Sequence, residues 1–97
     1  MIRREGDVLI VEGPATLHTV PGLVDAGEHF KNGAKSADFS RVTEVDSSAV
    51  ALALEWQRQA ARHGIALRLE NLPQAMQNLA RLYGVLELML GDNSASA

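Results

Sequence analysis

Apolar residues along the chain occur either in short runs typical of strands or in spaced stripes typical of helices. Residues 2–5 and 8–12 predict two short strands joined by a turn at residues 6–7. The run VLIV in the second strand is continuous and mostly β-branched, which predicts a strand buried on both faces. Gly13 and Pro14 predict the end of that strand.

The next stretch predicts a first helix. Thr19 is its expected N-cap, and Pro21 lies in the first turn, where a missing N–H costs little. Helical spacing gathers a core-facing apolar stripe: Val20, Leu23, Val24 and Phe30. The Asn-Gly pair at residues 32–33 predicts the end of the helix. We expect a short strand at residues 37–40, because this segment lies between two predicted helices.

The second helix has the clearest pattern, over residues 47–63, and Gly64 follows it. One face is apolar at 3.6-residue spacing: Ala49, Leu52, Ala53, Trp56 and Ala60. We expect Trp56 to be a core residue rather than a ligand-stacking surface. A second apolar strip lies beside the first: Val50, Leu54 and Ala61. Val50 and Leu54 therefore either pack beneath other elements or form an exposed flank.

The last third of the chain predicts a strand at residues 65–69 and a third helix. Asn71 is the expected cap of that helix, and Pro73 lies just inside it. Its inward positions are apolar or aromatic: Met76, Leu79, Ala80 and Tyr83. Residues 85–90 fit either a strand or a turn of helix.

This alternation of strands and helices predicts an α/β fold. We expect a mixed, mostly parallel β-sheet with helices packed against it. The length of 97 residues fits one domain. We assign that domain to residues 1–91 and expect residues 92–97, which are small and polar, to form a flexible tail.

Composition excludes several classes of function. A net charge of −3 argues against nucleic-acid binding, which needs a basic face. The absence of cysteine excludes disulfides and thiol catalysis. No apolar run approaches the roughly 20 residues that span a bilayer, so we expect no direct membrane insertion. The start, MIRREGDVL, does not resemble a signal peptide, and we expect a cytoplasmic protein.

Enzyme chemistry finds little support in the sequence. Ser47 or Ser48 would need a nearby base, yet His63 lies at the far end of the same predicted helix, about 20 Å away at 1.5 Å per residue. Neither a G-x-S-x-G turn nor a nucleotide-binding motif occurs. Histidine and acidic residues lack metal-ligand spacing. We therefore expect no enzyme activity, cofactor or metal.

The stretch TEVDSSAVALALEW raises a question about Asp46, Ser47 and Ser48. Such residues commonly cap a helix by accepting hydrogen bonds from its free N–H groups. A strand-to-helix junction is also where open α/β sheets gather binding sites. A hydroxyl there can contact a partner or be phosphorylated. The two interpretations are compatible.

The sequence RVTEVDSSAVALALEW, followed by a strand and by NLP, resembles the STAS domain of sulfate transporters and anti-sigma-factor antagonists. In those antagonists a D-S-[SA]-G motif presents a phosphorylatable serine, and Ser47 matches that position. Ala49 departs from the motif, where antagonists usually have glycine. The resemblance covers nearly the whole chain and implies the same fold.

The chain more narrowly resembles the MlaB-type subunits of phospholipid ABC transporters that maintain outer-membrane lipid asymmetry. Three segments carry this resemblance: VDSSAVALALEW, LRLENLP and LARLYGV. That likeness implies a non-enzymatic subunit that binds and stabilises or regulates the cytoplasmic ATPase, peripheral to the inner membrane. Ser47 and Ser48 would contact the ATPase, with Asp46 as helix cap and Val50 and Leu54 adding apolar area. The alternative is an anti-sigma-factor antagonist that is switched when an anti-sigma factor kinase phosphorylates Ser47.

Overall fold

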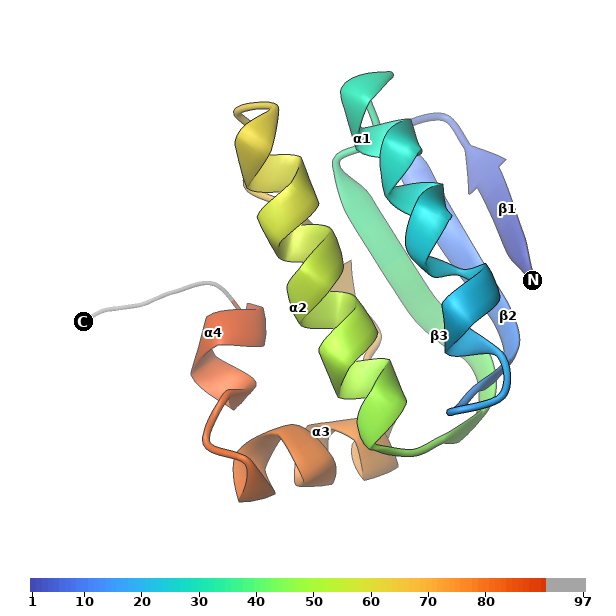
Figure 1. Cartoon of the computed structure of the whole chain (residues 1–97), viewed down its shortest axis with the longest axis vertical. Helices are drawn as coiled ribbons and strands as arrows, with labels where there is room; N and C mark the ends of the chain where they lie inside the picture. Colours follow the sequence, from blue (N-terminus) through green and yellow to red (C-terminus); the bar gives the residue numbers. More distant parts are fainter. Residues whose placement is uncertain (91–97) are drawn as a thin grey trace.

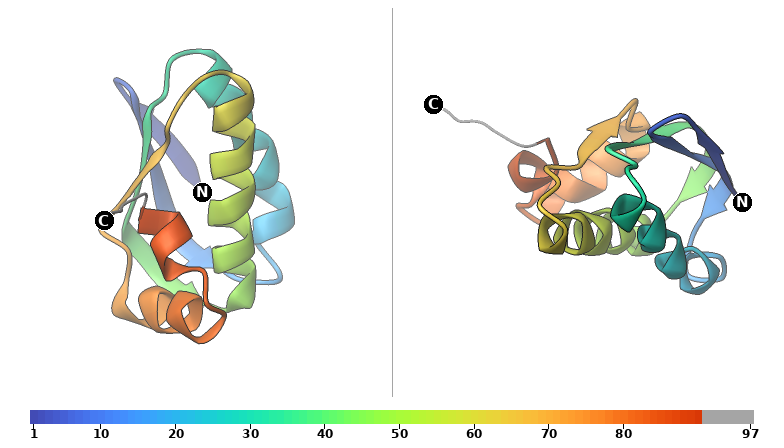
Figure 2. Two further views of the ribbon diagram at one scale, coloured as in Figure 1. Left: turned by 90° about the vertical axis from the view of Figure 1, so that its left-hand side faces the viewer. Right: turned by 90° about the horizontal axis from the view of Figure 1, so that it is seen from above.

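The computed structural model describes residues 1–90, which form one sheet with helices packed on one of its faces (Figures 1 and 2). In chain order, the elements are β1 (Ile2–Glu5), β2 (Val8–Ala15), the 3-10 turns η1 (Val20–Gly22) and η2 (Val24–Gly27), α1 (Glu28–Lys31), β3 (Ser36–Val45), α2 (Ser47–Arg62), β4 (Arg68–Glu70), α3 (Gln74–Leu82) and α4 (Leu86–Leu90). None of these helices has the length and apolar composition needed to cross a bilayer. The tail predicted at residues 92–97 lies outside the described residues.

The sheet confirms the predicted mixed, mostly parallel arrangement. Its strand order is β1-β2-β3-β4, with β1 antiparallel to β2 and the other neighbours parallel. From β2 to β4 each new strand is added on the same side of the previous one. Right-handed crossovers then place both helical connections on one face of the sheet. Figure 2 shows α1 and α2 on that face, α3 across the lower end of the molecule, and the opposite face free of helices.

Both long strands run further than the sequence predicted. β2 continues through Pro14 to Ala15, and β3 continues to Val45. The N-terminal segment pairs with β2 as far as Met1 and Glu12, whose backbones exchange two hydrogen bonds, so beyond Glu12 β2 pairs with β3 alone. A proline is tolerated on such a free edge, because its missing N–H removes no ladder bond. A register shift at this proline adjusts the remaining pairs.

The prediction of one continuous first helix is wrong. The segment consists of η1, η2 and the one-turn α1. Pro21, Gly22 and Gly27 account for the breaks, since proline and glycine are the poorest helix formers. Thr19 does not cap the segment; its hydroxyl instead donates to the Pro14 carbonyl at 2.8 Å. The predicted apolar stripe still reaches the core, with Val20, Leu23 and Phe30 buried and Val24 partly buried.

The second helix and its core residue are confirmed. α2 covers Ser47–Arg62, within one residue of the predicted end. Trp56 is fully buried. It packs edge-on against Phe30, with ring centroids 6.0 Å apart, and tilted against Phe39 at 6.2 Å. Its indole N–H donates to the Val24 carbonyl at 3.3 Å. Trp56 therefore joins both crossover connections to the sheet.

The C-terminal third differs from the prediction at β4 and at Tyr83, and it decides between the two alternatives left open for residues 85–90. β4 contains only Arg68–Glu70 rather than residues 65–69. Met76 and Ala80 are buried as expected, but Tyr83 is 53% exposed because α3 ends one residue before it. The ambiguous residues 85–90 form the short helix α4, which buries Met89 against the core.

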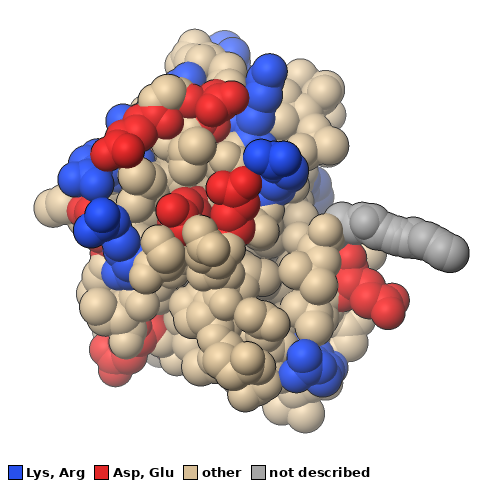
Figure 3. All heavy atoms as spheres, turned by 180° about the vertical axis from the view of Figure 1, so that it is seen from behind, with Lys and Arg blue, Asp and Glu red and all other residues tan. Residues whose placement is uncertain are grey.

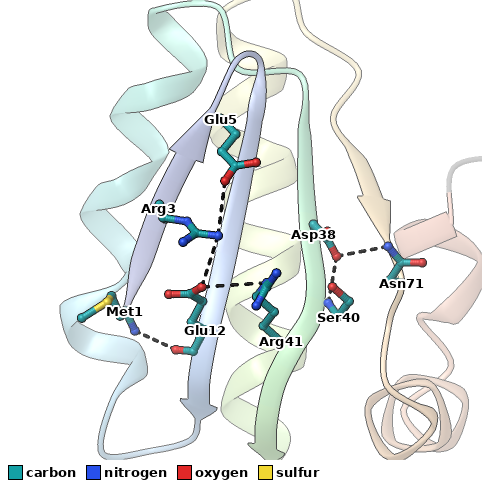
Figure 4. A network of polar contacts seen from close by, with 8 residues as sticks. All are labelled: Met1, Arg3, Glu5, Glu12, Asp38, Ser40, Arg41 and Asn71. Carbon is teal, nitrogen blue, oxygen red and sulfur yellow. Dashed lines mark hydrogen bonds and ion pairs between the residues drawn. The ribbon is translucent and has the colours of Figure 1, made fainter.

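Asn71 does not cap α3. That helix begins after Pro73 and has no side-chain cap. Asn71 instead has a left-handed φ of 58°, and its amide donates to Asp38 Oδ1 at 3.1 Å (Figure 4). Burial raises the pKa of Asp38, but hydrogen bonds from the Ser40 N–H and the Asn71 amide outweigh it and lower the pKa overall. Asn71 thus ties the loop before α3 to Asp38, near the start of β3.

Replacing Asn71 with alanine should lower the free energy of unfolding by about 1–3 kcal/mol. The change removes one hydrogen bond to a charged group and leaves alanine in a left-handed conformation that asparagine tolerates better. Urea denaturation would measure the loss. Asn71→Gly is the matched control, because glycine adopts this φ without strain but lacks the amide. A glycine variant less stable than the alanine variant would contradict the backbone part of this account.

Candidate functional site

The candidate site lies where β2 and β3 end together. These parallel strands finish in register, with Ala15 opposite Val45. The loop after β2 therefore meets the start of α2, at the lower end of the molecule in Figure 1. Asp46 is extended, with φ −137° and ψ −168°, and Ser47 is the first residue of the helix. We call the exposed surface around Leu17, Asp46 and Ser47 the docking corner.

The Asp46 carboxylate holds the docking corner together with both of its oxygens. Oδ1 accepts the Ser48 N–H at 2.8 Å, which confirms the predicted helix cap. Oδ2 accepts the Leu17 N–H, also at 2.8 Å. Leu17 comes from the loop after β2, 29 residues earlier in the chain. One side chain thus fixes both the start of α2 and the neighbouring loop.

These hydrogen bonds favour the ionised carboxylate. The Leu17 N–H has the largest effect, and together with the Ser48 N–H it lowers the pKa of Asp46 below its usual value of 3.8. A lowered pKa in the folded state means that the charge stabilises the fold above the unfolded pKa. That stability is lost as the pH falls through the folded pKa.

Replacing Asp46 with asparagine should make the stability of the protein less sensitive to acid. The asparagine oxygen can still cap the Ser48 N–H, but its NH2 group cannot accept the Leu17 N–H, so the change removes the charge and one of the two hydrogen bonds. We expect Asp46→Asn to melt at a lower temperature than the wild type at about pH 7, and the difference to shrink as the pH falls below 3.8 and through the folded-state pKa of Asp46. Thermal melts across that range measure the difference. A constant gap at all pH values would show that the Asp46 charge adds nothing.

The predicted site residues divide into an exposed group and a buried one. Ser47 is exposed, and its hydroxyl has no hydrogen-bond partner within residues 1–90. Ser48 is partly buried behind it. Val50, expected to add apolar area to an exposed flank, is only 3% exposed and belongs to the core, because this side of α2 faces the other elements. Leu54 is partly buried against the same core.

Sequence reasoning missed Leu17. This residue is 66% exposed and directly adjoins Asp46 through its backbone N–H. The residues around it, PATLHT, show only a lone leucine between polar residues. Its place at the docking corner depends on the register of β2 and β3, which the local pattern does not contain.

The structure separates the groups that a serine hydrolase would need. Ser47 begins α2 and His63 follows its last residue, so they lie at opposite ends of a rigid helix. Ser47 and His63 therefore cannot act together as nucleophile and base. Within residues 1–90, no group of three or more histidine or acidic side chains is placed to hold a metal ion.

The helix-free face of the sheet carries charges of both signs (Figure 3). Arg3 pairs with Glu5 at 3.2 Å and with Glu12 at 3.6 Å, and Arg41 approaches Glu12 at 3.9 Å (Figure 4). Such surface pairs contribute at most about 1 kcal/mol each. Since the charges are paired within the sheet, this face has no single-sign patch of the kind that binds nucleic acid.

Comparisons with known proteins agree with this geometry. A solved structure with a similar fold is the anti-sigma factor antagonist SpoIIAA in its unphosphorylated form, with a TM-score of 0.61 and 18% identity over 84% of this chain and 81% of that chain. Two structures of Mglu, one in its native form, have TM-scores of 0.55 and 0.54 and identities of 20% and 16%. They cover 76% and 74% of this chain but only 20% and 22% of the Mglu chains. At these identities the likeness shows the fold alone.

A comparison with curated protein sequences gives no match. The family model described as "Mlab, STAS domain" matches residues 2–91, nearly the whole chain. Its span includes every strand and helix of the described structure as well as the docking corner. The chain therefore belongs to the MlaB-type STAS domain family.

Proposed function

We propose that this chain is a non-enzymatic subunit that binds the cytoplasmic ATPase of a phospholipid ABC transporter maintaining outer-membrane lipid asymmetry, and stabilises or regulates it. It works in the cytoplasm, peripheral to the inner membrane through the transporter complex. Asp46, Ser47 and Ser48 form the contact, with part of Leu54 at its border. Val50 contributes only by packing beneath the helix.

The observation that carries the proposal is the exposed Ser47 hydroxyl on a firmly held helix start, in a chain that matches the MlaB-type family model. A small uncharged side chain leaves room for a partner backbone to approach. The Asp46 carboxylate already accepts two backbone N–H groups, so part of its hydrogen-bonding capacity is satisfied before any partner arrives. A partner that covers this corner therefore has fewer unpaired acceptor sites to satisfy.

Co-expression with the transporter ATPase tests this function. The purified ATPase and this chain should elute together in size-exclusion chromatography at a fixed ratio, and the ATPase should melt at a higher temperature in the complex. Separate elution at micromolar concentrations, with both proteins folded, would reject the proposal.

An anti-sigma-factor antagonist is the second candidate, favoured by the same exposed Ser47 hydroxyl. SpoIIAA, with its similar fold, is such an antagonist. This function requires phosphate transfer from ATP to Ser47 by an anti-sigma factor kinase, and Ser47→Ala would abolish it. The alanine at position 49, where the antagonist motif has glycine, is the feature that favours the transporter subunit.

A further inference from the structure

We propose that Leu17 is the apolar anchor of the docking corner and inserts into an apolar hollow on the transporter ATPase, while Asp46 acts as the residue that positions it. The inference rests on the proposed function and names the residue that gives the contact most of its affinity. Polar contacts from Ser47 and Ser48 then surround the anchor.

Leu17 is exposed, but exposure alone does not identify a binding residue. Six large hydrophobic side chains are mostly exposed within residues 1–90: Met1, Leu17, Leu82, Tyr83, Leu88 and Leu90. Four of them lie at or after the end of α3, and Met1 is the first residue. Leu17 is the one that adjoins the start of α2. A single exposed leucine is ordinary on protein surfaces, so the evidence for an anchor is the structure around Leu17.

The loop that carries Leu17 is held rigidly. The Thr19 hydroxyl accepts the Thr16 N–H at 2.9 Å and donates to the Pro14 carbonyl at 2.8 Å. The Thr16 carbonyl accepts the Thr19 N–H at 2.9 Å. The Leu17 N–H is bound to Asp46. A side chain presented on a fixed backbone loses little entropy on binding, which is how preorganised anchors gain affinity.

Leu17 and Ser47 also lie close enough together for one partner protein to cover both. The Leu17 N–H and the carboxylate of Asp46, the neighbour of Ser47, are 2.8 Å apart. A standard interface covers roughly 800 Å² on each partner, which is large enough to include both Leu17 and Ser47. Interfaces typically place an apolar anchor inside a polar rim. Val50, being buried, cannot supply that anchor, and Leu17 is the exposed residue that can.

Binding of Leu17 variants to the purified transporter ATPase tests the inference. Leu17→Asp should weaken binding by tenfold or more, as loss of a central anchor does, whereas Leu17→Met should bind within about threefold of the wild type. Leu88→Asp is the matched control, because Leu88 on α4 is also 66% exposed and lies outside the docking corner. It should bind like the wild type. Circular dichroism checks folding, and Leu17→Ala replaces Leu17→Asp if the aspartate variant is unfolded.

The outcomes separate this inference from the proposed function. Wild-type binding by a folded Leu17→Asp variant, alongside loss of binding by Ser47→Glu, would overturn the anchor and leave the proposed function standing. Equal weakening by Leu17→Asp and Leu88→Asp would also overturn it, because the effect would then not belong to the corner. No binding by the wild-type chain would reject the proposed function and the anchor together.

Discussion

Replacing Trp56 with alanine should lower the free energy of unfolding by about 3–5 kcal/mol, the usual cost of truncating a fully buried tryptophan. Trp56 is fully buried and contacts Phe30 from α1 and Phe39 from β3. Its removal leaves a cavity where the two crossover connections meet the sheet. It also leaves the Val24 carbonyl without its donor. For a domain of this size, the melting temperature should fall by more than about 10 °C.

The control for this change is Trp56→Phe. Phenylalanine keeps an aromatic ring between Phe30 and Phe39 but removes the indole N–H and part of the volume, so it should cost clearly less than alanine. Chemical denaturation of both variants, analysed with a common slope, measures the two losses. An alanine variant within about 1 kcal/mol of the wild type would contradict the core role of Trp56.

Sequence patterns predicted the elements whose stability is local and missed the features that depend on distant partners. α2 was predicted almost residue for residue, because its periodicity continues unbroken for four turns and a glycine follows it. The same apolar spacing continues through the segment from Val20 to Phe30. There Pro21 and two glycines prevent a continuous helix, yet the stripe still packs inward. Periodicity thus predicted which side chains are buried better than it predicted the backbone.

The candidate site shows the same division. Asp46 was predicted as a cap because capping needs only the next two residues. Its second bond, to Leu17, depends on β2 running past Pro14 so that it ends opposite Val45. In the sequence, Pro14 predicted the end of β2 rather than its continuation. Asn71 was similarly taken for a cap, whereas its partner Asp38 lies 33 residues away. Contacts that depend on strand register therefore could not be predicted from the local sequence pattern.

Replacing Ser47 with glutamate should weaken binding to the transporter ATPase by about tenfold to a hundredfold while leaving the fold intact. The new carboxylate must lose water when the partner covers the docking corner, which costs free energy. Folding should be unaffected or slightly favoured, since a negative charge in the first turn suits the helix dipole. Isothermal titration with the purified ATPase measures the affinity, and a thermal melt measures the fold.

Ala61→Glu is the matched control for that experiment. Ala61 is also exposed and on α2, but it lies 14 residues further along the helix, about 20 Å from Ser47. The two variants have the same net charge, so a general electrostatic effect on association would appear in both. Loss of binding in Ser47→Glu alone would place the contact at the start of α2. Full binding by a folded Ser47→Glu variant would mean that the ATPase contacts another surface.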